Sequence, residues 1–228
     1  MKLSISLTKK EVLLGWLFLI CQLSVLPAAL VIGNGLLPVP LDLSALNFVM
    51  FVINFCLCFA VFHRFLIASA KRAAFSPLRC LFYGALALGI YYIAGFLIGL
   101  FIGFVNPDFA NANDASIQSM AEENYSLIAF GTVFLVPIAE ECLYRGLLFC
   151  GFHRKSRILA YLLSTLVFAL IHVSGYIGVV SWPVLALSLL QYRPAGLSLA
   201  WAYEKTDTIW TPILMHMTIN LLSISSLR

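Results

Sequence analysis

Long apolar stretches separated by short polar loops are the feature that most restricts how this chain can fold. The stretch from Val12 to Leu41 contains no charged residue, and a helix needs about 20 apolar residues to cross a bilayer. Hydrophobic residues make up 62% of the 228 positions and charged residues 11%, whereas soluble domains have roughly 45–50% and about 25%. This composition excludes a soluble domain and predicts an all-α polytopic membrane protein in contact with the lipid bilayer.

Eight apolar segments can be marked, and we expect about eight transmembrane helices. They cover residues of about 12–33, 44–66, 81–105, 125–150, 157–173, 177–191, 194–204 and 209–226. The sixth and seventh are short, and the seventh is expected to be partial or strongly tilted. Because no linker or repeat divides the chain, we predict a single integral membrane domain over residues 1–228.

Loop charges predict the orientation. Basic residues gather near the N-terminus, at 64–79 and at 154–157, whereas loop 106–124 is acidic. Cytoplasmic loops carry an excess of Lys and Arg, so we expect eight crossings with both termini in the cytoplasm. We predict that the chain is a multi-pass protein located in the plasma membrane of a prokaryote.

One segment carries a row of small residues, Gly95, Gly99 and Gly103. This spacing lets membrane helices approach closely. We expect the row to pack against another helix of the same chain rather than to form a dimer seam.

Two carboxylates and an arginine interrupt the fourth apolar segment. Glu141 and Arg145 are four residues apart with the acid first, the favourable order for a helical ion pair, so we expect Arg145 to neutralise Glu141. Glu140 then points about 100° away around the helix and is free to act as a general base. Pro137 loosens the preceding turn, as is tolerated where a helix lines a polar cavity. Taken alone, this segment fits an ion pair that only locks helices together equally well.

Histidines follow in two later apolar segments. Phe168 precedes His172 by one turn, and His216 precedes Asn220 by one turn. The imidazole and amide groups of His216 and Asn220 could donate two hydrogen bonds to a developing oxyanion. A packed neutral histidine and an interhelical hydrogen-bonded pair are the structural alternatives.

The three clusters share a depth. Glu141, His172 and His216 lie roughly 18, 22 and 14 Å from the polar ends of their segments at about 1.5 Å per residue. In a hydrocarbon core of about 30 Å, these positions are near one level. We therefore predict one shared site in an intramembrane polar cavity.

Three short motifs in fixed order carry a family resemblance: Glu140-Glu141-x-x-x-Arg145, Phe168-x-x-x-His172 and His216-x-x-x-Asn220. This set resembles the CPBP family, which comprises the type II CAAX prenyl proteases and the bacteriocin-processing intramembrane proteases and is also called the Abi family. The stretch 203–216, which leads up to His216, also resembles this family. The resemblance covers about residues 125–225, and the N-terminal half carries no motif.

The resemblance implies an eight-helix fold and an intramembrane endopeptidase with a glutamate-dependent site. Glu140 would activate water and His172 would assist it, while His216 and Asn220 would stabilise the oxyanion. The remaining motif residues would support this geometry: Glu141, Arg145 and Phe168. The substrate would be a peptide or membrane-associated protein, with prenylated CAAX proteins, bacteriocin leaders and signalling peptides all open.

Metal use stays open at this stage. Glu140, His172 and His216 would suffice as three protein ligands for catalytic zinc, and the family is often labelled metalloprotease. Because the HExxH arrangement is absent and the family also resembles metal-free glutamate catalysis, we favour no tightly bound cofactor. We expect no nucleic-acid partner, and nothing in the sequence indicates an oligomeric state.

Two other functions remain as alternatives. An ion- or proton-coupled transporter would use the buried carboxylates as relays, although no inverted repeat is visible. A non-catalytic immunity or accessory protein of the membrane would use the same motifs structurally.

Overall fold

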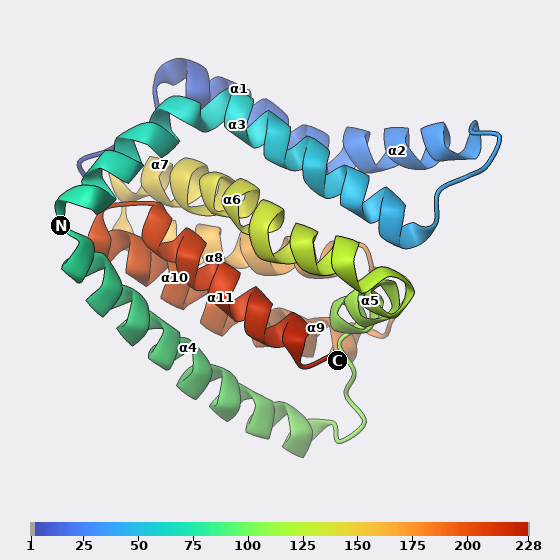
Figure 1. Cartoon of the computed structure of the whole chain (residues 1–228). Helices are drawn as coiled ribbons and strands as arrows, with labels where there is room; N and C mark the ends of the chain where they lie inside the picture. Colours follow the sequence, from blue (N-terminus) through green and yellow to red (C-terminus); the bar gives the residue numbers. More distant parts are fainter. Residues whose placement is uncertain (1–2, 228) are drawn as a thin grey trace.

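The computed structural model describes residues 3–227, which form a bundle of helices with no β-strand among them (Figure 1). The predicted all-α class is therefore confirmed. The helices are α1 (Lys9–Ile20), α2 (Leu26–Gly35), α3 (Leu43–Phe75), α4 (Pro77–Val105), α5 (Ala112–Phe130), α6 (Val136–Glu141), α7 (Cys150–His153), α8 (Arg157–Ser174), α9 (Trp182–Gln191), α10 (Arg193–Thr206) and α11 (Trp210–Ser225). Wider π-helical turns connect some of them: η1 (Cys21–Val25), η2 (Gly131–Leu135) and η3 (Cys142–Phe149).

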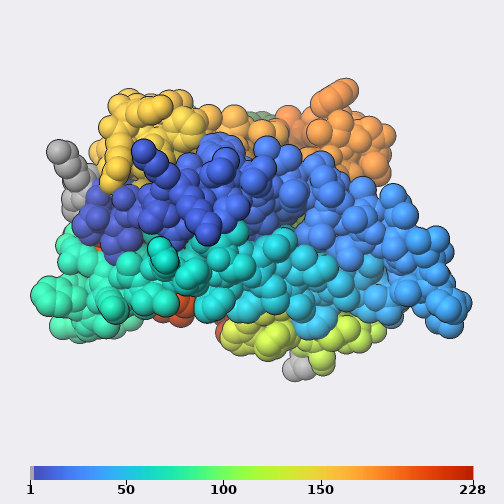
Figure 2. Space-filling view, turned by 90° about the horizontal axis from the view of Figure 1, so that it is seen from above, coloured from blue at the N-terminus to red at the C-terminus, as the bar shows by residue number. Residues whose placement is uncertain are grey.

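The N-terminal helices cover one face of the bundle. Figure 2 shows α1, α2 and α3 lying along that face. Thr8 and Glu11 begin α1 with reciprocal side-chain to backbone hydrogen bonds, which satisfy backbone donors left open at a helix start. Glu11 also accepts a hydrogen bond from the Phe65 backbone N–H at 3.3 Å. This contact fixes the antiparallel register between α1 and α3.

A helical run from Ala112 to His153 passes through the centre of the bundle. It is kinked at Asn124, whose backbone is extended (φ −148°) and whose side chain accepts from the Leu127 N–H. The expectation of a loop over 106–124 was wrong for most of its length, because Ala112–Glu123 is helical. Asn111 explains why α5 begins at Ala112, since its side chain accepts hydrogen bonds from two backbone N–H groups of the first helical turn.

The basic end of the bundle is tied together by two buried acids. Asp207, in a left-handed turn after α10, accepts hydrogen bonds from Ser4 and pairs with Arg72. Glu204 is 2% exposed, and its carboxylate is bound by three side chains: Arg157, His153 and Tyr161.

The two short segments follow each other directly along the bundle. Only Tyr192 separates α9 from α10, and α10 ends beside Ser4, whereas Ile224 near the end of α11 lies beside Tyr125 at the other end (Figure 1). The described ends of the chain therefore lie at opposite ends of the bundle. This arrangement favours one crossing for segments 177–191 and 194–204 together, where the sequence predicts two, and the side of the membrane on which each terminus lies stays a prediction.

In the described part of the chain, five helical runs are long and apolar enough to cross a membrane: 9–35, 43–75, 77–105, 112–153 and 157–174. The remaining helices α9, α10 and α11 have 10, 14 and 16 residues. A multi-pass membrane protein is thus supported, while the count of eight crossings stays a prediction.

The glycine row of α4 does not pack as expected. A Cβ added at Gly95, Gly99 or Gly103 would meet nothing within 4 Å, and the row borders a pocket of about 380 Å³. The first half of α4 packs on α10 and α11, whereas its second half diverges from the bundle (Figure 1). Gln191 at the end of α9 lines this pocket across from the glycine row.

Candidate active site

The two glutamates lie where the central helix changes its winding. Glu140 and Glu141 end α6, which begins with Val136-Pro137, and the π-helical turns of η3 follow directly. Single π-helical turns inside α-helices are frequent at functional sites. Every residue of η3 is buried, so the carboxylates are attached to the most enclosed part of the fold.

The predicted ion pair between Glu141 and Arg145 is present. Arg145 Nη1 donates to Glu141 Oε1 at 2.7 Å, and both side chains are fully buried. Arg145 Nη2 donates to the Gly196 carbonyl at 3.2 Å, and the guanidinium lies 4.8 Å above the Phe168 ring. A cation placed over an aromatic face is stabilised further.

Close packing at Gly196 makes this contact available. A Cβ at Gly196 would lie 2.6 Å from Thr165 Cγ2 and 3.1 Å from Thr165 Cα. Only glycine therefore lets α10 approach α8 so closely. The approach brings the Gly196 carbonyl within reach of Arg145.

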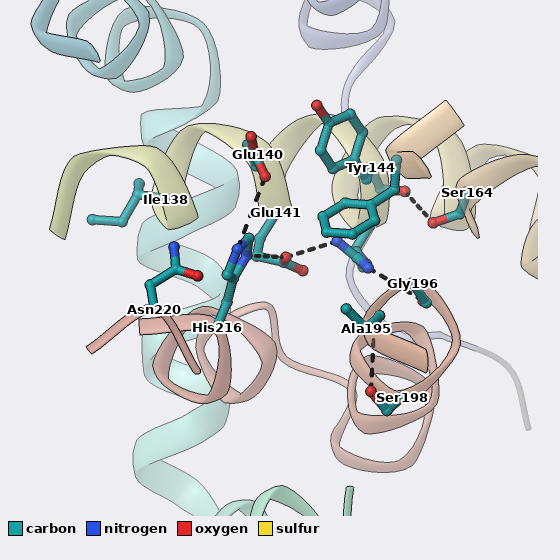
Figure 3. Close-up of polar contacts among 12 residues, drawn as sticks. Ile138, Glu140, Glu141, Tyr144, Ser164, Ala195, Gly196, Ser198, His216 and Asn220 are labelled. Carbon is teal, nitrogen blue, oxygen red and sulfur yellow. Dashed lines mark hydrogen bonds and ion pairs between the residues drawn. The ribbon is translucent and has the colours of Figure 1, made fainter. Parts of the chain in front are cut away.

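His216 lies between the two glutamates, as Figure 3 shows. Its Nδ1 donates to Glu141 Oε1 at 2.9 Å, and its Nε2 is 4.0 Å from Glu140 Oε2. Glu141 thus receives hydrogen bonds from Arg145 and His216, whereas Glu140 Oε2 is buried and has no hydrogen-bond partner among residues 3–227. The two adjacent carboxylates consequently differ: Glu141 accepts two hydrogen bonds, whereas Glu140 lies at ion-pair distance from His216 without a hydrogen bond to its buried Oε2.

His172 is oriented by its own helix and by an aromatic neighbour. Its Nδ1 donates to the Phe168 carbonyl at 2.7 Å, which leaves Nε2 as an acceptor in the neutral ring. The Tyr192 ring packs on the imidazole with centroids 4.5 Å apart. Tyr192 in turn donates its hydroxyl hydrogen to Asp114 at 3.0 Å.

Asn220 bridges α11 and η2. Its Nδ2 donates to the Thr132 carbonyl at 2.7 Å. An amide nitrogen carries two hydrogens, so one N–H remains for another acceptor.

A cavity of about 840 Å³ unites these groups. Its wall includes the four side chains that the sequence predicts to be catalytic, Glu140, His172, His216 and Asn220. Phe168 also lines the cavity. The intramembrane polar cavity expected from the sequence is therefore present. Glu141 and Arg145 are fully buried and do not line this cavity, and the supporting role expected for them stays a prediction.

The structure shows no ready-made set of metal ligands among the residues that it describes. Within residues 3–227, no three His, Cys, Asp or Glu side chains gather closely enough to hold a metal ion. His216 Nδ1 donates to Glu141, and this leaves its Nε2 towards the cavity. The expectation of no tightly bound metal stays a prediction.

Several residues at the site were not predicted from the sequence. Tyr192 and Asp114 support His172, Thr132 holds Asn220 and Gly196 accepts from Arg145. None lies in a motif, and each acts through contacts between helices that are distant in sequence. Tyr192, the aromatic residue between two short apolar segments, is the only one with a local signal.

The part of the chain that carries this site is similar to a known protein family. Residues 122–222 match the family model described as Type II CAAX prenyl endopeptidase Rce1-like. The resemblance predicted from the three motifs is thereby confirmed. All seven motif residues lie within this Rce1-like segment, and helices α1 to α4 lie outside it.

Two curated proteins are similar to parts of the chain. "Putative membrane peptidase YdiL" of Bacillus subtilis (strain 168) is 29% identical over 85 residues, which are 37% of this chain and 30% of that protein. "UPF0177 protein YxdF" of Lactococcus lactis subsp. lactis (strain IL1403) is 30% identical over 94 residues, 41% of this chain and 46% of that protein. The matches thus span less than half of either relative. No solved structure matches the chain significantly.

Proposed function

We propose that this protein is a CAAX-protease-like membrane endopeptidase in which Glu140 activates the attacking water. The observation that carries the proposal is the inequality of the two carboxylates. Glu141 is held by Arg145 and His216, while Glu140 faces the cavity without a hydrogen-bond partner among residues 3–227. A general base must present a free acceptor to the proton it removes.

The proposed chemistry begins with a water molecule in the cavity. Glu140 takes one proton, the water oxygen bonds to the scissile carbonyl carbon, and the carbonyl oxygen becomes an oxyanion. Glu140 then passes the proton to the amide nitrogen, the C–N bond breaks, and a carboxylic acid and an amine result. His172 Nε2 is the acceptor placed to assist in holding the water.

Donors for the oxyanion come from α11. Asn220 has one amide hydrogen left after its bond to Thr132. His216 donates its Nδ1 hydrogen to Glu141, so Nε2 can donate only when the ring is protonated.

The substrate in this proposal is a peptide or a membrane-associated protein. A scissile bond must reach a cavity enclosed by helices, so the substrate segment is unwound and extended when it is cut. The proposed step is metal-free, with Glu140 alone activating the water.

Cleavage of a hydrophobic peptide library by the purified protein tests the proposal. Glu140→Gln keeps the side-chain shape but removes the base, so turnover should fall about 10²–10⁴-fold while the melting temperature is retained. Glu122→Gln, on the exposed surface of α5, is the matched control. Normal cleavage by Glu140→Gln refutes the role of this residue. Complete loss of activity with a chelator, restored by added zinc, refutes the metal-free step.

A further inference from the structure

The cavity wall opposite the catalytic side chains carries polar groups that the proposed chemistry does not use. Asn54 on α3 lines the cavity, is 8% exposed, and its Oδ1 is buried without a hydrogen-bond partner among residues 3–227. Gln22 in η1 also lines it, with its Oε1 in the same condition. A buried polar group without a hydrogen bond destabilises a fold. The presence of two such groups in the lining of one cavity therefore suggests that a ligand supplies their missing hydrogen bonds.

The packing of α1 on α3 places these amides at one level. Phe65 contacts Glu11, and the Phe62 ring lies against Gly15. Gln22 is seven residues beyond Gly15, and Asn54 is eight residues before Phe62. Because the two helices are antiparallel, these offsets bring the side chains to nearly the same height.

Contacts of α3 with the central helix locate that level relative to Glu140. Phe51 packs on Gly131, and Cys58 Sγ lies 3.6 Å from the Ile138 carbonyl, so the two helices run in parallel. Asn54 is then level with about residue 134, six residues before Glu140 and roughly 9 Å away along the axis at about 1.5 Å per residue. An extended peptide advances about 3.3 Å per residue, so three residues cover this distance.

We propose that Asn54 and Gln22 form a substrate subsite that binds the backbone N–H groups of an extended peptide about three residues from the scissile bond. An unwound peptide in a membrane cavity must have its backbone groups satisfied by the protein, and amide oxygens accept from N–H groups. The subsite lies towards α5, on helices outside the Rce1-like segment. It rests on the proposed function for the position of the cleaved bond.

Peptide binding to the Glu140→Gln protein tests the subsite without requiring turnover. The probe is a fluorescent Leu- and Ala-rich peptide, with its backbone amides N-methylated one at a time and binding followed by anisotropy in detergent. Methylation at one or two neighbouring positions should weaken binding about tenfold, the scale of one lost hydrogen bond. The Asn54→Leu variant should bind the unmethylated peptide about tenfold more weakly and lose this sensitivity.

Asn47→Leu is the matched control, because Asn47 lines the same cavity on the same face of α3 but lies seven residues, roughly 10 Å at about 1.5 Å per residue, further from Glu140 along the axis. It should retain the sensitivity to methylation. Asn54→Leu should also melt at the same or a higher temperature, because an unpaired polar group is replaced by an apolar one.

Unchanged methylation sensitivity in Asn54→Leu, or absence of binding by every peptide, overturns the subsite. A lower melting temperature with unchanged binding does so too, because it makes Asn54 structural. If Glu140→Gln cleaves normally, the proposed catalytic step fails while the binding result still stands.

Discussion

At Arg145, burial and charge combine to make one side chain indispensable to the fold. Its guanidinium is fully buried and binds Glu141, the Gly196 carbonyl and the Phe168 ring. Arg145→Ala leaves Glu141 as an uncompensated buried charge, and breaking such a pair typically costs about 3–5 kcal/mol. We expect a large drop in melting temperature in detergent. Arg154→Ala, which removes an exposed arginine, should change little. Equal stability of the two variants would contradict the buried pair.

Tyr192 allows a second test at the scale of one residue. Tyr192→Phe keeps the ring on His172 but removes the hydroxyl that donates to Asp114, whereas Tyr192→Leu removes both. Ring contacts contribute about 0.5–1.5 kcal/mol, so Tyr192→Leu should lower kcat about 2–10-fold below Tyr192→Phe. The same kcat in both would remove the ring from the positioning of His172.

The sequence predicted the contacts of the site that join residues on the same helix. Glu141 and Arg145 pair along one helix, so their spacing was sufficient to predict the contact. The contact of His216 with Glu141 joins residues 75 apart in sequence, and no local pattern encodes it. For the same reason, Gly196 and Asn54 carried no signal before the helices were placed together.

Between elements, Gly196 limits the separation of α10 and α8. In Gly196→Ala the new methyl would overlap Thr165 Cγ2 and press on its backbone Cα. Overpacking typically costs about 1–3 kcal/mol, so the melting temperature and the activity should both fall. Gly89→Ala, where a Cβ meets nothing within 4 Å, should be neutral or slightly stabilising. Adding Thr165→Ser, which removes the overlapping methyl, should restore part of the loss, and no restoration would contradict this explanation.

The end of α10 is held to α8 by a charge that depends on pH. Burial alone raises the pKa of the Glu204 carboxyl, but hydrogen bonds from Arg157, His153 and Tyr161 outweigh it and lower the pKa to about 2. A lowered pKa stabilises the fold above the ordinary value near 4.5 and loses that contribution as pH falls towards about 2. Glu204→Gln should therefore reduce stability at pH 7 and weaken the decline below pH 4.5, both measured by thermal melting. An unchanged pH profile would contradict the role of Glu204.

Helix patterns predicted the long elements better than the short ones. The apolar runs that become α3, α4 and α8 were predicted because length alone identifies a spanning helix. Segments 177–191 and 194–204 were too short for this criterion, and tertiary contacts decide that α9 and α10 follow each other in one return. The glycine row of α4 predicted a closely packed neighbouring helix. In the structure these glycines border a pocket instead, because packing between distant helices decides where α4 has a neighbour.

Over the whole molecule, the charged residues divide between the two ends of the bundle. Lys71, Arg79 and Lys205 lie at the end where Ser4 meets Asp207, whereas Asp108 and Glu122 lie at the end with α5. By the positive-inside rule we expect the first end to be cytoplasmic. The chain enters α1 at this end and leaves α11 at the other (Figure 1). We therefore predict that the C-terminus lies on the outer side, whereas the loop charges of the sequence alone predict both termini in the cytoplasm.

Single cysteines labelled in sealed right-side-out vesicles test this orientation, in a background where the six native cysteines are replaced by serine. An impermeant maleimide should modify Asp108→Cys and Ser226→Cys from outside, because both follow helices that end away from the basic end. Lys71→Cys should react only after the vesicles are opened, which also serves as the control for sealing. Labelling of Ser226→Cys only in opened vesicles, together with Lys71→Cys, would place both ends on one side. The chain would then need an additional crossing, and the single return formed by α9 and α10 is where the bundle would have to supply it.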